Sequence, residues 1–149
     1  FENYPIDFLK KEINIGLIGS IICTKIFGNM MSLKGNGSIV NISSDLGSIA
    51  PNQNLYNTNF KQFKVVKPIS YSVIKHGING LTKYTSTYWA KNNIRCNSLS
   101  PGGVYNNQDK DFVKKLSYLI PLGRMAKPEE ISGVLIFLLS NASKDSPFL

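Results

Sequence analysis

The chain has 149 residues and a formal net charge of +8 at pH 7, with 17 basic and 9 acidic residues. This length supports a hydrophobic core, and we expect residues 1–149 to form a single partial domain. The basic residues are scattered, without the basic stripe and interleaved aromatic residues of a nucleic-acid-binding surface, and one His with two Cys cannot supply an ordinary zinc site. We therefore expect no metal, and nucleic-acid binding ranks last among the functions considered.

Residues 6–33 are predicted to form a long helix with one buried face. Its apolar side chains recur every three or four residues, at Ile6, Leu9, Ile13, Leu17, Ile21, Ile22, Ile26, Met30 and Leu33. The small residues Gly16, Gly19 and Ser20 permit close approach of another helix. The sequence "KGNGS" at 34–38 ends the helix, because Gly and Asn tolerate the left-handed conformation.

Two features bear on the compartment. The apolar run at residues 13–27 is interrupted by polar residues and falls short of the ~20 residues of a spanning helix, so we expect no membrane segment. Cys23 and Cys96 lie in apolar stretches far apart in the sequence. We expect both to be buried thiols in a reducing, cytoplasmic compartment.

Strands and helices alternate along the rest of the chain. The pattern predicts strands at 38–43 and 93–100, a long connection at 45–70, and helices at about 71–91, 109–118 and 128–140. Helix, strand, helix, strand, helix is the order of parallel strands joined by right-handed crossovers, so the expected fold class is α/β with a parallel sheet.

The candidate chemistry lies where the two strands end. The first strand ends at Ser43-Ser44 and the second at Pro101-Gly102-Gly103, and ligands of parallel sheets bind at the carboxyl ends of strands. The helix between them carries Tyr71 and Lys75, which are four residues apart and share one face.

A lysine ammonium favours the ionised form of a neighbouring phenol, and ionising a phenol at neutral pH costs about 4 kcal/mol without such help. Such a phenol can exchange a proton with an oxygen that changes between alcohol and carbonyl. A chain this rich in Tyr and Lys holds one such pair by chance, so an ordinary surface pair is the alternative.

Four segments, "GSIVNISSDLG", "YSVIKHGINGLT", "IRCNSLSPGGV" and "IPLGRMAKPEEI", occur in this order. Together they resemble the short-chain dehydrogenase/reductase family over nearly the whole chain. The resemblance implies a Rossmann-like doubly wound parallel sheet, NAD or NADP as cofactor, a small-molecule substrate, and a homodimer or homotetramer that pairs through the helices at 6–33 and 71–91.

The resemblance also implies roles for individual residues. Tyr71 would be the general acid/base, Lys75 would assist it and hold the nicotinamide ribose, and Ser44 would orient the reacting oxygen. Asn14 would hold a water of the proton relay; the alternative is an ordinary helix amide. The turn with Pro101, Gly102 and Val104, followed by Asn106 in place of the usual Thr, would meet the nicotinamide amide. His76, Arg124 and Pro128 would be structural.

Two departures from the family pattern stand out. The Gly-rich turn that holds a dinucleotide pyrophosphate is missing, so we expect the N-terminal dinucleotide-binding half and the last strand of the sheet to lie outside this chain, which should be inactive alone. Ser44 and Tyr71 are 27 positions apart, about twice the usual gap.

The surplus between Ser44 and Tyr71 lies in "PNQNLYNTNFKQFKVVKP". Its polar residues are Asn52, Gln53, Asn54, Asn57, Asn59, Lys61, Lys64 and Lys67. They favour a hydroxylated, sugar-like or anionic substrate, as in short-chain dehydrogenases of surface-sugar and flagellin-modification pathways. A catalytically silent remnant or a binding module is the rival hypothesis.

Overall fold

Helices and strands follow one another in the predicted order. A computed structural model describes residues 1–56 and 66–145. Its main elements are α1 (Ile6–Ile13), a π-helical stretch (Asn14–Ile18), α2 (Gly19–Lys34), β1 (Gly37–Ile42), α3 (Ile69–Tyr88), β2 (Ile94–Leu99), α4 (Lys110–Leu119) and α5 (Pro128–Leu139). Short 3₁₀ turns occupy Asp45–Gly47, Gln53–Tyr56, Ala90–Asn92 and Asn141–Ser143. The predicted Asn57, Asn59, Lys61 and Lys64 lie outside the described residues.

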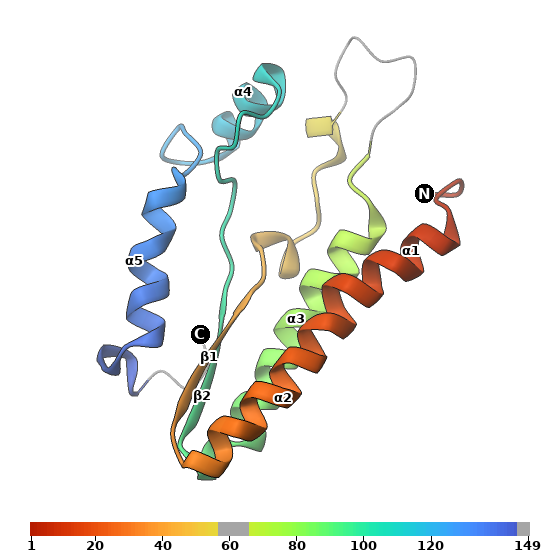
Figure 1. Cartoon of the computed structure of the whole chain (residues 1–149). Coiled ribbons are helices and arrows are strands. Elements are labelled where there is room, and N and C mark those ends of the chain that lie inside the picture. The colour runs from red at the N-terminus through yellow and green to blue at the C-terminus, as the bar shows by residue number, and fades with distance from the viewer. Residues whose placement is uncertain (57–65, 146–149) are drawn as a thin grey trace.

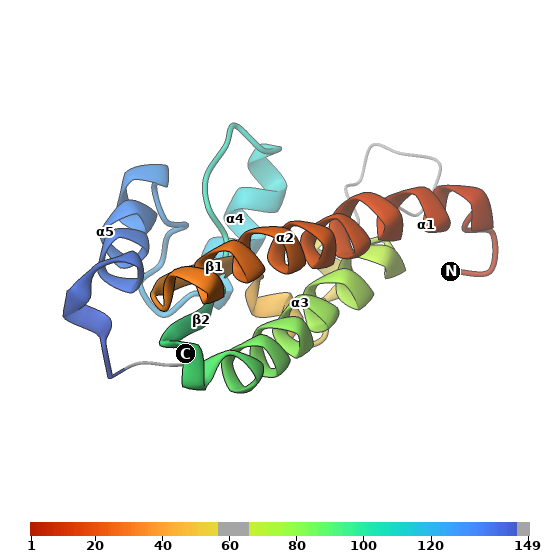
Figure 2. The ribbon, with the colours of Figure 1, turned by 60° about the horizontal axis from the view of Figure 1, so that its bottom comes forward.

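The two strands form a parallel pair, as predicted. Gly37 faces Ile94 at one end of the ladder and Ile42 faces Leu99 at the other. Helix α3 is the crossover between them. Figures 1 and 2 show α2 and α3 on one face of the strand pair and α5 on the opposite face, which is the layered α/β arrangement.

The core centres on β2. Ile94, Cys96 and Leu99 are buried there, with Ile78 of α3 and Leu138 of α5. Burial on both faces is typical of a strand inside a parallel sheet. Burial also raises the pKa of the Cys96 thiol to about 12, as expected for a buried thiol.

Most of the apolar face of the helix Ile6–Lys34 points outward, contrary to the prediction. Within this helix only Thr24 and Gly28 are buried, whereas Ile22, Met30 and Leu33 are 50%, 53% and 82% exposed. The prediction that Cys23 is buried was wrong for the same reason, because this residue is exposed.

Small residues determine which face of the helix Ile6–Lys34 packs against its neighbours. A β-carbon at Gly16 would lie 3.0 Å from Ile74 Cδ1 of α3, and one at Gly28 would lie 2.1 Å from Trp89 Cζ3. The helix therefore approaches its neighbours through glycines, as expected for Gly16, and its large side chains occupy other faces.

The helix Ile6–Lys34 is also longer and more apolar than the run at 13–27 suggested. It has 29 residues, and an 18-residue window in it reaches a mean hydropathy of 1.4 with 11% of that window buried. By length and composition alone it could cross a membrane, so the prediction of too short a segment was wrong. The run at 13–27 covered only the central part of this helix.

Candidate active site

A cavity of about 390 Å³ lies at the carboxyl ends of both strands, beside the N-terminal part of α3. Six of the predicted site residues line it: Ser44, Tyr71, Lys75, Pro101, Gly102 and Val104. Asn14 and Asn106 are both exposed and are not among the lining residues. The structure thus brings together the residues predicted from three separate segments of the chain.

The end of β1 fixes the two serines differently. The Ser43 hydroxyl donates to the Lys75 carbonyl at 3.1 Å, which ties the strand to α3. The Ser44 hydroxyl donates to Asp45 Oδ1 at 2.7 Å and accepts the Leu46 N–H at 3.2 Å. Ser44 is therefore held by its own turn, at the wall of the cavity.

This turn also closes tightly against α3. A β-carbon at Gly47 would lie 2.6 Å from Ser43 Oγ and 2.9 Å from the Lys75 carbonyl oxygen. Asn79 Nδ2 donates to the Gly47 carbonyl at 2.9 Å. Only glycine at position 47 allows this approach without displacing α3.

Lys75 reaches from α3 to the end of β1. Its Nζ donates to the Ile42 carbonyl at 2.9 Å and stands 5.7 Å from the centroid of the Tyr71 ring. Burial lowers the pKa of the Lys75 ammonium. An ammonium has three donor hydrogens, so after the bond to Ile42 it retains donors for a ligand in the cavity.

The turn after β2 forms the opposite wall. The Asp45 N–H donates to the Pro101 carbonyl at 3.1 Å, and the Ala126 N–H donates to the Gly103 carbonyl at 2.9 Å. A β-carbon at Gly103 would lie 2.6 Å from Leu116 Cδ2, whereas one at Gly102 would come no closer than 3.6 Å to Asp45. Gly103 is thus packed by the protein, and Gly102 leaves room at the cavity.

Sequence reasoning missed several residues of this cavity. Gln108 stabilises the turn after β2, because its Nε2 donates to the Val104 carbonyl at 2.8 Å and its Oε1 accepts the Asn106 N–H at 2.7 Å. Asp45 could have been found from its place directly after Ser44. Nothing in the sequence distinguishes Gln108 from other polar loop residues. Lys67 was predicted only as one of the polar residues before Tyr71, since its place in the cavity depends on the fold.

Residues expected to be structural lie outside the cavity. His76 Nδ1 lies 2.9 Å from the Ser72 carbonyl oxygen within α3. Arg124 binds both carboxylate oxygens of Glu130 at 2.7 and 2.8 Å, and the same carboxylate accepts the Lys127 N–H at 2.8 Å. These bonds fix the start of α5, where Pro128 occupies the first turn.

The donors in the cavity fit one end of a nicotinamide dinucleotide. The Lys75 ammonium and the Tyr71 hydroxyl are suited to a ribose diol, and the open position at Gly102 leaves space for a flat ring beside the backbone. Within residues 1–56 and 66–145, no strand is joined to a helix by the Gly-x-Gly-x-x-Gly turn that holds a dinucleotide pyrophosphate. The adenosine and pyrophosphate end therefore finds no partner among the described residues.

Parallel strands, helices on both faces and a Tyr–Lys pair at the carboxyl edge define part of a Rossmann-like dehydrogenase or reductase. Residues 1–145 match the family described as "Enoyl-(Acyl carrier protein) reductase". The chain belongs to the short-chain dehydrogenase/reductase family.

Two curated relatives and one solved structure illustrate the similarity. The chain is 35% identical over 135 residues to "Post-translational flagellin modification protein A" of Campylobacter coli, covering 90% of this chain and 51% of the relative. It is 32% identical over 151 residues to "NADH-dependent L-xylulose reductase" of Ambrosiozyma monospora, covering 95% and 51%. A short-chain dehydrogenase of Leptospira borgpetersenii with bound NAD+ matches with a TM-score of 0.87 at 32% identity, over 97% of this chain and 54% of that one.

These matches settle two points about the fold. The chain spans about half the length of the relatives that it matches, in keeping with the incomplete sheet predicted from the sequence. The match also includes the helix Ile6–Lys34, so this apolar helix is an element of the Rossmann-like fold.

Proposed function

We propose that the protein is an NAD- or NADP-dependent oxidoreductase that interconverts an alcohol and a ketone. The observation that carries this proposal is the convergence of Ser44, Tyr71 and Lys75 on one cavity at the carboxyl edge of the sheet. Family membership supports the cofactor, since the relatives named above include an NADH-dependent reductase and a dehydrogenase with bound NAD+.

Each residue has a distinct part in the proposed reaction. The nicotinamide, when bound, supplies or accepts the hydride. The Tyr71 hydroxyl gives a proton to the carbonyl oxygen, or takes one from the alcohol. Lys75 favours the ionised phenol and holds the ribose, and the Ser44 hydroxyl holds the reacting oxygen.

Two further roles rest on the family resemblance. Asn14 would hold a water of the proton relay, and it stands where α1 changes into the π-helical stretch, so that the Gly19 N–H donates to the Asn14 carbonyl. Such local π-turns are frequent at functional sites. Asn106 would approach the cofactor amide from the turn that Gln108 holds.

The substrate is proposed to be polar or sugar-like. The polar lining residues Asn52 and Gln108 support this, as does similarity to an L-xylulose reductase and a flagellin modification protein. We also propose a cytoplasmic homodimer or homotetramer in which the exposed apolar side chains of α2 and α3 are covered by a second copy. A strict monomer in sedimentation of the whole protein would refute that assembly.

The proposal is tested by Tyr71→Phe in the whole protein, with Tyr118→Phe as the matched control. Tyr118 lies on α4, is 89% exposed and does not line the cavity. Tyr71→Phe is expected to lower kcat by about 100-fold or more, the range for a lost general acid, while cofactor binding by calorimetry changes little. Unaltered turnover in Tyr71→Phe would refute the proposal, and a wild-type protein that binds cofactor without any turnover would support the silent-remnant hypothesis.

A further inference from the structure

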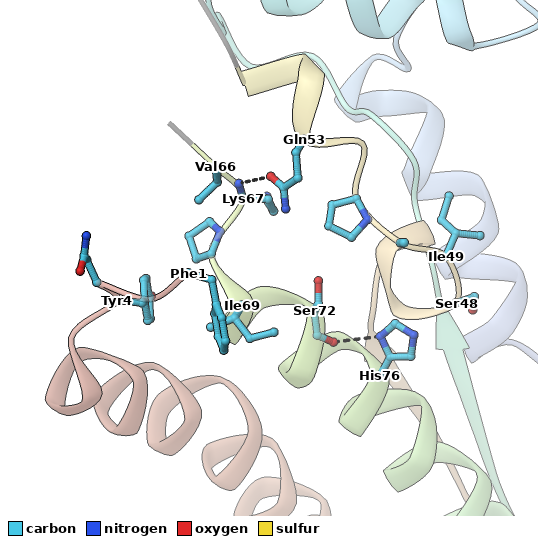
Figure 3. A pocket seen from close by; sticks show the side chains of 14 residues that line it. Phe1, Tyr4, Ser48, Ile49, Gln53, Val66, Lys67, Ile69, Ser72 and His76 are labelled. Carbon is cyan, nitrogen blue, oxygen red and sulfur yellow. Dashed lines mark hydrogen bonds between the residues drawn. The ribbon is translucent and has the colours of Figure 1, made fainter. Parts of the chain in front are cut away.

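Lys67 enters the cavity from the segment between Ser44 and Tyr71 and has no part in the reaction proposed above. Its backbone N–H donates to Gln53 Oε1 at 2.8 Å (Figure 3). Pro68 follows it, and the residue before a proline is restricted to extended conformations. The position of Lys67 in front of α3 is therefore fixed by a hydrogen bond and by the chain itself.

The ammonium of Lys67 lies against the ring of Tyr71. Its Nζ is 3.7 Å from the centroid of the Tyr71 ring and 5.8 Å from that of Tyr56. A cation within about 6 Å of a ring centroid is attracted by the face of the ring. Since Lys75 Nζ is also within this distance of Tyr71, the phenol has one ammonium more than proton transfer requires.

The charges that line the cavity are unequal. Lys67 and Lys75 face one carboxylate, Asp45, whose Oδ1 already accepts the Ser44 hydroxyl and the Leu46 N–H, both at 2.7 Å. In the part of the chain that the structure describes, no ion pair joins Asp45 to either lysine. The pKa of the Lys67 ammonium is lowered, mainly by burial and also by the charge of Lys75, although the Asp45 carboxylate acts in the opposite direction. A bound anion would offset the free-energy cost of holding the Lys67 ammonium partly out of water.

We propose that Lys67 binds a carboxylate of the substrate, so that polyhydroxy acids and their keto acids are preferred over neutral polyols. This inference rests on the proposed function, because Tyr71 must hold the reacting oxygen. A carboxylate bound to an ammonium lies about 2.7–2.9 Å from it. Because Lys67 Nζ contacts the Tyr71 ring, that carboxylate lies only a few carbon–carbon bonds from the oxygen at the Tyr71 hydroxyl.

The size of the charge surplus favours a carboxylate over a phosphate. With the Tyr71 hydroxyl protonated, ready to give its proton to a carbonyl oxygen, one ammonium is left over after Asp45 is counted against the two lysines. A carboxylate brings one negative charge, whereas a phosphate monoester brings about −1.5 to −2 at pH 7. Hydroxyl groups between the carboxylate and the reacting carbon can meet the side chains of Asn52 and Gln108, which line the same cavity.

The test compares acids with matched neutral polyols in the whole protein, with NAD and with NADP. The pairs are D-gluconate against D-glucitol and L-tartrate against L-threitol, in which a CH2OH group replaces each carboxylate. Lys67→Met removes the charge and Lys67→Arg keeps it. Lys91→Met is the control, because it removes the same charge from an exposed residue of the 3₁₀ turn Ala90–Asn92.

Lys67→Met is expected to lower kcat/KM for the acids by about tenfold to a hundredfold, the range for a lost hydrogen bond to a charged group. The polyols should be little affected, Lys67→Arg should recover most of the loss, and Lys91→Met should match the wild type. Equal losses for acids and polyols would mean that Lys67 acts only on the Tyr71 phenol and binds no substrate carboxylate, and would overturn the inference. So would a wild-type preference for polyols, or for D-glucitol 6-phosphate over D-gluconate.

A binding measurement separates this inference from the proposed function. In calorimetric titrations of the protein loaded with reduced cofactor, which cannot oxidise the acid, L-tartrate should bind to the wild type and to Lys91→Met, and about tenfold more weakly to Lys67→Met. Tartrate binding that is absent or indifferent to Lys67→Met overturns the inference. Turnover that survives Tyr71→Phe, or tartrate binding through Lys67 without any turnover, refutes the proposed function and leaves the carboxylate site standing.

Discussion

Ser43 and Ser44 are adjacent at the end of β1, yet replacement by alanine is expected to affect them in opposite ways. The Ser43 hydroxyl donates to the Lys75 carbonyl, and the residue is 3% exposed. Ser43→Ala therefore loses one buried hydrogen bond between strand and helix, worth about 0.5–1.5 kcal/mol. The Lys75 ammonium is bound to the Ile42 carbonyl instead, so turnover of the folded protein should be nearly unchanged.

Ser44→Ala should reduce activity and leave stability almost intact. The Leu46 N–H that Ser44 accepts is also accepted by Asp45 Oδ1 at 2.7 Å, so no buried donor loses its last partner. The loss of stability should stay below about 1 kcal/mol. If the Ser44 hydroxyl holds the reacting oxygen, kcat should fall by about 100-fold to 1,000-fold, as for other donors of this kind.

Both variants are measured in the whole protein by urea unfolding and by steady-state kinetics, beside Ser132→Ala as an exposed control on α5. Cofactor affinity is measured separately, so that a lost hydride donor is not mistaken for a lost hydroxyl. The reasoning is refuted if Ser43→Ala abolishes turnover while Ser44→Ala retains it, because the choice between the two serines would then be reversed.

Two further predictions concern packing and pH. Gly28→Ala should destabilise the protein by about 1–3 kcal/mol, since its β-carbon would lie 2.1 Å from Trp89. Gly80→Ala should stabilise α3 by about 0.5–1 kcal/mol, because a β-carbon there would have nothing within 4 Å. Equal effects of the two variants in urea unfolding would contradict this prediction. Hydrogen bonds from Arg124 lower the pKa of Glu130 to about 2, so the ion pair contributes stability above the unfolded pKa of ~4.3 and loses it as the pH falls towards 2. The difference in Tm between wild type and Glu130→Gln should shrink over that range, and a constant difference would exclude the ion pair as its cause.

The arrangement of elements could be predicted from local signals. Gly35 adopts φ 69° at the end of α2, as the "KGNG" sequence indicated, and Pro128 begins α5. Strand bounds differ from the predictions by one residue at each end. These features depend on residues close in sequence, which is why a single sequence carries them.

What the sequence could not supply was the direction of each apolar face. The periodicity of the helix Ile6–Lys34 marks an apolar stripe, yet it does not say which neighbour covers that stripe. In the structure, the contact with α3 and Trp89 falls on Gly16 and Gly28. The sequence marked Lys67 only as one of several polar residues before Tyr71, because its contact with the Tyr71 ring depends on where the segment after Gln53 rejoins α3.

The position of the candidate catalytic pair depends on a short stretch of α3, residues 74–79. On one side, Ile74 and Gly77 pack against the π-helical stretch, where a β-carbon at Gly77 would lie 2.9 Å from Leu17. On the other side, the Lys75 carbonyl accepts the Ser43 hydroxyl and Asn79 donates to the Gly47 carbonyl.

Close packing transmits displacement rather than absorbing it. A larger residue at position 77 or 47 would therefore shift residues 74–79 of α3, and Lys75 with them, relative to the end of β1. Tyr71 lies one turn further towards the start of α3, where Lys67 contacts its ring. The Tyr71–Lys75 pair is thus held by glycines that carry no chemistry of their own.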